Sequence, residues 1–173
     1  MNDRKQLLQQ KLKATKQKIS RKELIELLPD NLSVVIEEAT FFTDPKVEHI
    51  LNNLYNLWNN ELHLHSFINK YSENRKEFSW ENEVISFVQG LNFKQELGYL
   101  YVGIEKSPLY LVGGKWLIEN FDVFWEQISF EDIWFFGKDL SNGVLVSQYG
   151  GYLEHDPNPK EIMYAITYWG IDK

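Results

Sequence analysis

The chain has 173 residues, a formal net charge of −7 and a sequence pI near 5.1, values that fit one domain large enough to bury a core. It contains no cysteine, which excludes a disulfide framework, a thiolate zinc site and a thiol nucleophile. No stretch approaches the ~18 apolar residues of a membrane span, and residues 1–10 lack the apolar run of a secretory signal, so we expect a cytoplasmic protein.

Charged and aromatic residues are sorted along the chain. Residues 1–29 hold eight Lys/Arg against three Asp/Glu, whereas residues 30–173 hold ten against twenty-two. Sixteen of the twenty-six aromatic residues fall between Tyr99 and Trp169, and residues 1–40 contain none. We therefore expect a basic helical lead over residues 1–29 and a single acidic α+β domain over residues 30–173.

The basic lead is predicted to form two helices. Residues 4–18 are rich in Lys and Gln and carry a narrow apolar stripe at helical spacing. Ser20 and Glu23 match a capping box, which predicts a second helix over residues 21–28 that stops before Pro29. A connector through Asp30 and Asn31 and a short apolar piece over residues 34–42 should follow. The stripe consists of Leu8, Leu12 and Ile19.

Two amphipathic helices are predicted next. Asp44 and Pro45 supply a cap and a first helical residue for the clearest helix of the chain. Residues 70–79 are polar and charged, which predicts a loop, and a helix follows Ser79 and ends near Gly90. The apolar positions of the first helix are Val47, Leu51, Leu54, Trp58, Leu62 and His65 or Ile68.

From residue 97 the pattern changes to that of strands. The fold class is therefore α+β, with N-terminal helices followed by a mostly antiparallel sheet of five or six strands. The last element could begin as a helix after Pro159, but its alternating apolar residues favour a strand. The expected order is a hairpin of residues 97–105 and 109–119, a short helix over 122–128, a strand over 133–136, a two-residue turn at Asn142-Gly143, a strand over 144–149, a turn or bulge at Gly150-Gly151, a piece over 152–155 and a final strand over 161–169.

Patterns that suggest catalysis or metal binding have simpler structural explanations. His63 and His65 are two residues apart and would point to different sides of a helix, so they do not predict a metal site. His155 lies in a Pro-rich turn. Gly113-Gly114-Lys115 lacks the frame of a phosphate loop and suggests a bulge inside a strand. We predict no metal, no cofactor and no enzymatic activity; a hydrolase using scattered acids is a third alternative.

The region between residues 122 and 156 combines acidic and aromatic residues at helix ends, turns and strand edges. Such a surface could bind a basic protein, because carboxylates steer the encounter and aromatic anchors slow dissociation. The alternative is that the aromatic residues form the core and the acids keep the protein soluble. The candidate partner-binding residues are Glu126, Glu131, Asp132, Asp139, Glu154, Asp156, Trp125, Trp134 and Tyr152.

The order of features in this half resembles that of small bacterial immunity proteins of polymorphic-toxin and contact-dependent inhibition systems. The segments that carry the resemblance are Lys-Trp-Leu-Ile around Trp116, Phe-Trp-Glu-Gln-Ile, Asp-Ile-Trp-Phe-Phe and Gly-Gly-Tyr-Leu-Glu-His-Asp up to Asp156. Leu28-Pro29-Asp30 and Phe136-Gly137-Lys138-Asp139 are similar to motifs of the SUKH superfamily, although the glycine pair expected after the Leu-Pro step is missing. Both resemblances imply a cytoplasmic α+β binder that neutralises a toxin by contact.

The leading hypothesis is therefore an immunity-type protein that binds and neutralises a cognate basic toxin domain, for example a nuclease, through its acidic half. The alternative is a nucleic-acid-associated or regulatory adaptor that uses the basic helix, although the acidic body should repel nucleic acid. The simplest view of that helix is a solvated helix packed by its few leucines. Its basic residues are Lys5, Lys11, Lys13, Lys16, Lys18, Arg21 and Lys22.

Overall fold

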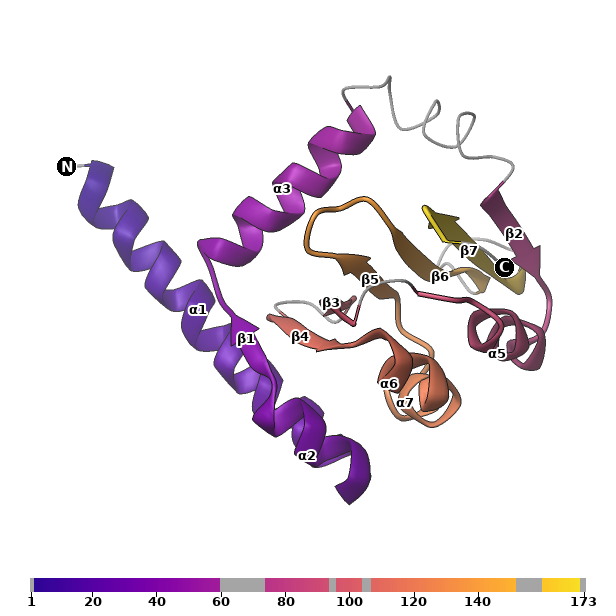
Figure 1. Cartoon of the computed structure of the whole chain (residues 1–173). Helices are drawn as coiled ribbons and strands as arrows, with labels where there is room; N and C mark the ends of the chain where they lie inside the picture. The colour runs from indigo at the N-terminus through magenta and orange to yellow at the C-terminus, as the bar shows by residue number, and fades with distance from the viewer. Residues whose placement is uncertain (1, 60–73, 94–95, 104–106, 152–159, 172–173) are drawn as a thin grey trace.

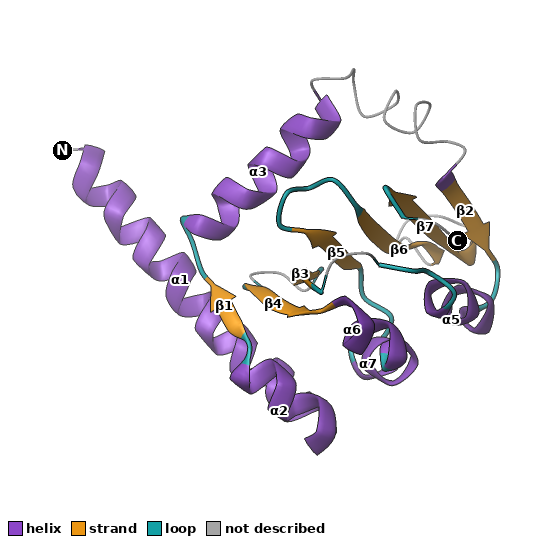
Figure 2. Ribbon diagram, viewed as in Figure 1, coloured by secondary structure: helices purple, strands orange, loops and turns teal. Residues whose placement is uncertain are grey.

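The computed structural model describes residues 2–59, 74–93, 96–103, 107–151 and 160–171. Within them, seven strands form one sheet in the order β1-β4-β3-β5-β6-β7-β2, and every neighbouring pair is antiparallel (Figures 1 and 2). The α+β class and the antiparallel sheet are confirmed, with more strands than the five or six expected. The strands are β1 (Thr40–Phe42), β2 (Arg75–Phe78), β3 (Leu97–Val102), β4 (Leu109–Gly113), β5 (Ile133–Gly137), β6 (Gly143–Gly151) and β7 (Lys160–Trp169).

Helices cover both faces of this sheet. The larger core lies on one face, where helices from the N-terminal and middle parts of the chain pack on alternate residues of the central strands, such as Leu100, Phe135 and Ile166. The smaller core contains Leu54 of α3 and Phe136, which follows Phe135 and points to the opposite face of the sheet. The helices are α1 (Asn2–Leu27), α2 (Asp30–Glu38), α3 (Lys46–Asn59), α5 (Glu81–Gln89), α6 (Gly114–Glu119) and α7 (Phe121–Gln127).

The basic lead is one continuous helix, so the expected break at Ser20 is wrong. Leu24 and Leu28 are 2% and 6% exposed and belong to the larger core, and their packing holds the C-terminal half of α1 against the body. Tertiary packing therefore overrides the local capping signal at Ser20 and Glu23. The expected connector at residues 30–31 is also wrong, because α2 begins at Asp30, directly after Pro29 in an extended conformation.

Four further differences concern the sheet. Residues 75–78, expected as a loop, form the edge strand β2, which pairs with β7. Strand β4 ends at Gly113, and helix α6 begins at Gly114, where a continuing strand was expected. Asn142-Gly143 is not a two-residue turn, because Gly143 pairs with Phe136 across a longer loop in which Leu140 adopts a φ of 62°. The strand expected over residues 97–105 is β3, which ends at Val102.

Several expectations are confirmed. The two predicted amphipathic helices are α3 and α5, and the short helix expected over residues 122–128 is α7. The last element is the strand β7, as favoured. Asp44 caps α3, because its Oδ1 accepts a hydrogen bond from the backbone N–H of Glu48 at 3.3 Å. The pairing of β6 with β7 shifts between Tyr149 and Gly151, as expected for a bulge at the glycine pair. Expectations for residues 60–73 and 152–159 lie outside the described residues.

Candidate partner-binding groove

A groove of about 330 Å³ runs along the exposed sides of α5 and α7. Trp80, which precedes α5, is 66% exposed and Val123 on α7 is 39% exposed, so large apolar groups are open to solvent here. Exposed rings and aliphatic groups of this kind are common anchors of protein interfaces. The groove is lined by Trp80, Glu81, Asn82, Ile85, Asp122, Val123, Glu126 and Phe130.

A second hollow, of about 340 Å³, shares the lining residue Phe130 with the first. Its other walls are polar, and they come from the turn that leads from α7 into β5 and from Gln148 on β6. We call the two hollows together the acidic groove. The residues that line the second hollow are Ser129, Phe130, Glu131, Asp132 and Gln148.

The turn between α7 and β5 gives the acidic groove a fixed shape. Ser129 and Phe130 both adopt left-handed conformations, with φ of 57° and 60°, which non-glycine residues keep only when their surroundings hold them. The backbone N–H of Phe130 donates to Trp125 O at 3.0 Å, and that of Glu131 donates to Ile128 O at 3.2 Å. Two backbone hydrogen bonds therefore hold the turn at Phe130 and Glu131.

Trp125 forms the floor beneath this turn. It is fully buried, it stacks on Phe121 at 5.4 Å between centroids, and it meets the rings of Phe130 and Tyr164 edge-on. Its indole Nε1–H donates to Glu131 O at 3.1 Å, so the one polar atom of the side chain is satisfied. Trp125 therefore positions the groove and has no surface that a partner could touch, and its predicted role as a contact anchor is wrong.

The carboxylate of Glu81 is held at the rim by the sheet below. Tyr164 Oη, from β7, donates to Glu81 Oε1 at 2.5 Å. This hydrogen bond lowers the pKa of Glu81, since it favours the charged carboxylate. Burial, together with the bond to Glu81, raises the pKa of Tyr164 to about 12. Glu81 is thus a fixed negative charge at neutral pH.

Asp132 lies deeper than its neighbours. It is half-buried, and its Oδ1 accepts a hydrogen bond from the backbone N–H of Gln148 at 3.3 Å. Burial raises the pKa of Asp132, the bond from Gln148 opposes that shift, and the neighbouring charge of Glu131 adds to it. Asp132 therefore helps to join the turn to β6 as well as adding charge to the acidic groove.

The charge of the acidic groove has one sign. Five of the residues that line it are acidic, and none of them is Lys or Arg. None of the five acids makes an ion pair within the part of the chain that the structure describes. Unpaired carboxylates around apolar side chains favour a partner that presents cations around an apolar centre.

The structure brings together only some of the candidate partner-binding residues predicted from the sequence. Glu126 and Glu131 are exposed in the acidic groove, and Asp132 lies between them and β6. Asp139 lies in the loop after β5, at the opposite end of that strand from Asp132, and accepts hydrogen bonds from the backbone and hydroxyl of Ser141. Trp134 is half-buried on the other face of the sheet, edge-on to Tyr55 at 5.8 Å. Tyr152, Glu154 and Asp156 lie outside the described residues.

Sequence reasoning found only Glu126, Glu131 and Asp132 and missed the rest of the lining, including the apolar residues Trp80, Val123 and Phe130. The helix expected directly after Ser79 would include Trp80, but Trp80 occupies the N-cap position of α5 in an extended conformation (φ −132°, ψ 139°). A side chain at that position does not follow the helical period. Its place directly after Ser79 and before the acidic pair Glu81 and Glu83 was the available signal.

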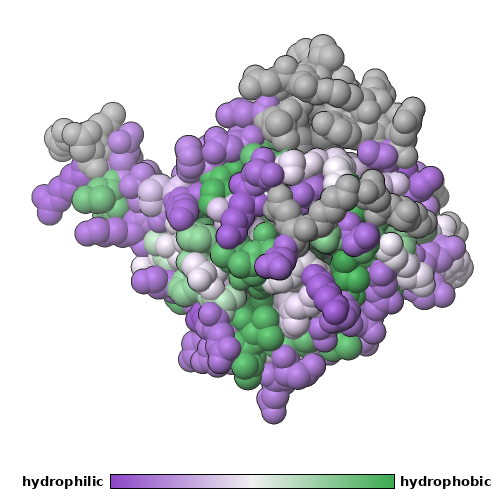
Figure 3. All heavy atoms as spheres, in the orientation of Figure 1, coloured by the Kyte–Doolittle hydropathy of each residue, from purple (hydrophilic) through white to green (hydrophobic). Residues whose placement is uncertain are grey.

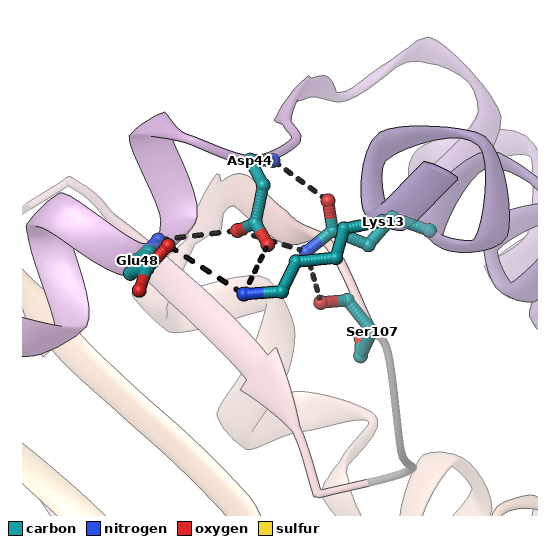
Figure 4. A network of polar contacts seen from close by, with 5 residues as sticks. Lys13, Asp44, Glu48 and Ser107 are labelled. Atoms are coloured by element: carbon teal, nitrogen blue, oxygen red, sulfur yellow. Dashed lines mark hydrogen bonds and ion pairs between the residues drawn. The ribbon is translucent and has the colours of Figure 1, made fainter. Parts of the chain in front are cut away.

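A separate hollow with acidic groups, of about 290 Å³, lies between α1 and α3, and we call it the α1/α3 cleft. Figure 4 shows the polar contacts of its Lys13, Asp44, Glu48 and Ser107. Here the acids already have partners in the same chain. Lys13 Nζ lies 3.9 Å from Asp44 Oδ2 and 3.6 Å from Glu48 Oε2. Gln17 is buried, donates to Asp44 Oδ1 at 3.3 Å and to Ser107 O at 3.5 Å, and accepts from the backbone N–H of Asp44 at 2.7 Å. This network fixes α1 to the body.

The described residues contain neither a metal-binding cluster nor a membrane-spanning helix. No group of three or more His, Asp or Glu side chains there is placed to hold a metal ion. No helix there is both long enough and apolar enough to span a bilayer.

Comparison with known proteins identifies the family. Residues 1–168 match the family described as YokC prophage protein. The chain belongs to this family. It is 52% identical over 171 residues to the SPbeta prophage-derived protein YokC of Bacillus subtilis (strain 168), an alignment that covers 99% of this chain and 100% of that protein. No solved structure was found to match the chain. The family match spans both α1 and the sheet.

Proposed function

We propose that the chain is a non-enzymatic, immunity-type inhibitor whose acidic groove binds a basic protein domain, such as that of a toxin. The observation that carries this proposal is the lining of the groove: three acids lie with exposed Trp80 and Val123 in one hollow, two more acids line the other hollow, and neither lining includes Lys or Arg. Carboxylates in this arrangement could occupy the positions at which a nuclease binds phosphates, while the apolar groups hold the complex once formed.

The rigidity of the groove supports the same proposal. The pinned turn at Ser129 and Phe130, the buried Trp125 and the bond between Tyr164 and Glu81 hold the surface in shape before a partner arrives. A preformed site loses less conformational entropy on binding than one that must be ordered, so affinity is higher for the same contacts. This is the arrangement that a tight inhibitor needs.

The test is protection of growth. Basic toxin domains encoded in the same genome would each be expressed in a host cell with the wild-type chain, with Glu126→Lys/Glu131→Lys, or with the matched control Glu37→Lys/Glu38→Lys on the exposed end of α2. We expect wild type and control to restore growth against one such domain, and the groove variant to restore it at least tenfold less.

With that toxin purified, the same three proteins give the association rate. Because charge steers the encounter, the groove variant should associate more slowly and lose its dependence on salt. Equal protection by all three proteins, or no protection by the wild type against any basic domain, would reject the proposal.

The alternative, binding of nucleic acid by the basic helix, is favoured by one observation. Five cations of α1 are exposed and form no ion pair within the described part of the chain. A gel shift with duplex DNA or RNA at low salt, lost on charge reversal of Lys11 and Lys18, would support it. The cations are Arg4, Lys5, Lys11, Lys16 and Lys18.

A further inference from the structure

The outward face of α1 carries an apolar stripe with nothing against it among the described residues. Leu8, Leu12 and Ile19 are 69%, 55% and 54% exposed. At about 100° per residue, the three side chains lie within about 40° of one another around the helix, on the side away from buried Gln17 and Leu24. The stripe therefore points away from the protein's own core.

Cations flank this stripe on both sides. At the same helical rotation of about 100° per residue, Arg4, Lys11 and Lys18 fall along one border of the stripe. Lys5 and Lys16 fall along the other, and all five side chains are exposed. Figure 3 shows the free end of α1 projecting from the body, with a small apolar group among hydrophilic side chains. The surface that would match this face is an apolar groove bordered by acids.

The face cannot turn inward to cover itself. Gln17 and the Lys13–Asp44–Glu48 ion pairs fix one side of α1 to the start of α3, and Arg21 donates to the carbonyl oxygen of Glu37 at 2.6 Å. Arg21 also lies over the ring of Phe41, 4.4 Å from its centroid. These contacts hold the opposite side of the helix, so no part of the chain that the structure describes covers the stripe.

The acidic groove of the same protein has the complementary pattern. Trp80, Ile85 and Val123 supply apolar surface, and Asp122 and Glu126 lie beside them. Figure 1 places α1 at one side of the molecule and α5 at the other, with the sheet between them, so a single chain cannot join the two surfaces. A second copy can, because the two surfaces lie on different molecules in such a contact.

We propose that the outward face of α1 docks into the acidic groove of a second copy of this chain. The contact uses the groove of the proposed function, so a basic partner and a second copy would compete for it. It joins two different surfaces, which makes it heterologous, and repetition of such a contact builds rings or open chains. Self-association should therefore grow with protein concentration and weaken with salt.

The experiment measures the mass of the full-length protein by sedimentation velocity over a concentration series at low and high salt. Four proteins are compared: wild type, the helix variant Lys11→Glu/Lys18→Glu, the groove variant Glu126→Lys/Glu131→Lys and the control Glu37→Lys/Glu38→Lys. We expect wild type and control to associate, and each of the other two alone to associate at least tenfold more weakly.

Mixing the helix and groove variants is the decisive step. The mixture contains an intact basic face on one protein and an intact acidic groove on the other, so association should return. A wild type that stays monomeric at low salt would overturn the proposal, and so would a groove variant that associates like wild type, which would indicate contact between α1 helices. Binding of α1 to DNA by a wild type that remains monomeric would overturn it in favour of nucleic acid.

The two proposals can fail separately. If mixing restores association but no basic domain is neutralised, the self-association stands and the immunity function falls. If a toxin is neutralised through the groove and the wild type never associates, the immunity function stands and the self-association falls.

Discussion

The acidic groove and the α1/α3 cleft contain similar chemical groups but have different roles. In the α1/α3 cleft, Asp44 receives hydrogen bonds from Gln17 and Glu48, and Lys13 lies within 4 Å of its carboxylate. In the acidic groove, Glu126 and Glu131 have no cation among the residues that line it. A carboxylate with partners in its own chain joins elements of the fold, whereas one without them is available to another molecule.

The largest effect should come from the floor of the acidic groove. Trp125→Ala removes a fully buried ring with three aromatic neighbours, and we expect it to lower the free energy of unfolding by about 3–5 kcal/mol. Trp80→Ala, at an exposed position, should change it by less than about 1 kcal/mol. Urea denaturation followed by far-UV circular dichroism measures both. Equal losses would mean that Trp80 is part of the core.

Asp44→Ala tests the fold-joining role of the α1/α3 cleft. The substitution removes the cap of α3 and leaves Gln17 without its side-chain acceptor, so we expect a loss of about 1–3 kcal/mol in unfolding free energy. Glu126→Lys, in the acidic groove, serves as the contrast and should change stability by about 0.5 kcal/mol or less. If Glu126→Lys were the more destabilising of the two, the distinction between the two sites would fail.

The pair of Glu81 and Tyr164 predicts a pH dependence. The folded-state pKa of Glu81 is lowered, so its stabilisation is present above the unfolded pKa and is lost as the pH falls through the folded value. The pKa of Tyr164 is raised to about 12, so its stabilisation is complete below about pH 10 and is lost as the pH rises toward that value.

Tyr164→Phe should therefore reduce the loss of stability on both the acid and the alkaline side. Thermal unfolding midpoints measured from pH 3 to 11 for wild type and variant check this. Parallel profiles over the whole range would show that the hydrogen bond contributes nothing to the pH dependence.

The smallest effect is expected for Lys13. Its side chain is 56% exposed, and exposed ion pairs are screened by water and salt. Lys13→Gln should lower the free energy of unfolding by about 0.2–1 kcal/mol at low salt, and the difference from wild type should shrink at high salt. A large loss that salt does not change would assign Lys13 a packing role instead.

The sequence allowed the major elements to be predicted because their signals are local. The apolar spacing that begins at Val47 and the alternation that ends at Trp169 identify α3 and β7 whatever surrounds them. The missed strand β2 has no such signal, because its Arg75, Lys76 and Glu77 resemble a loop and only pairing with β7 makes them a strand. Edge strands of this kind depend on their neighbour.

The acidic groove could be predicted only in part for the same reason. Glu126 and Glu131 are close in sequence and were found, whereas Trp80 joins them only because α5 packs near α7. The stripe at Leu8 and Leu12 was also visible as a helical pattern, but its direction depends on which face of α1 packs on the body. Trp125 was misassigned because composition does not distinguish a ring on the surface from one beneath it.

The short outer strands decide how this molecule can meet others. Strand β1 has three residues and lies beside α1, where Arg21 covers Phe41, and β2 has four residues with two cations among them. Such edges offer few free backbone groups and resist the addition of a foreign strand. Growth of the sheet from one molecule into the next is therefore disfavoured, which protects the protein from amyloid-like aggregation and leaves recognition to side chains.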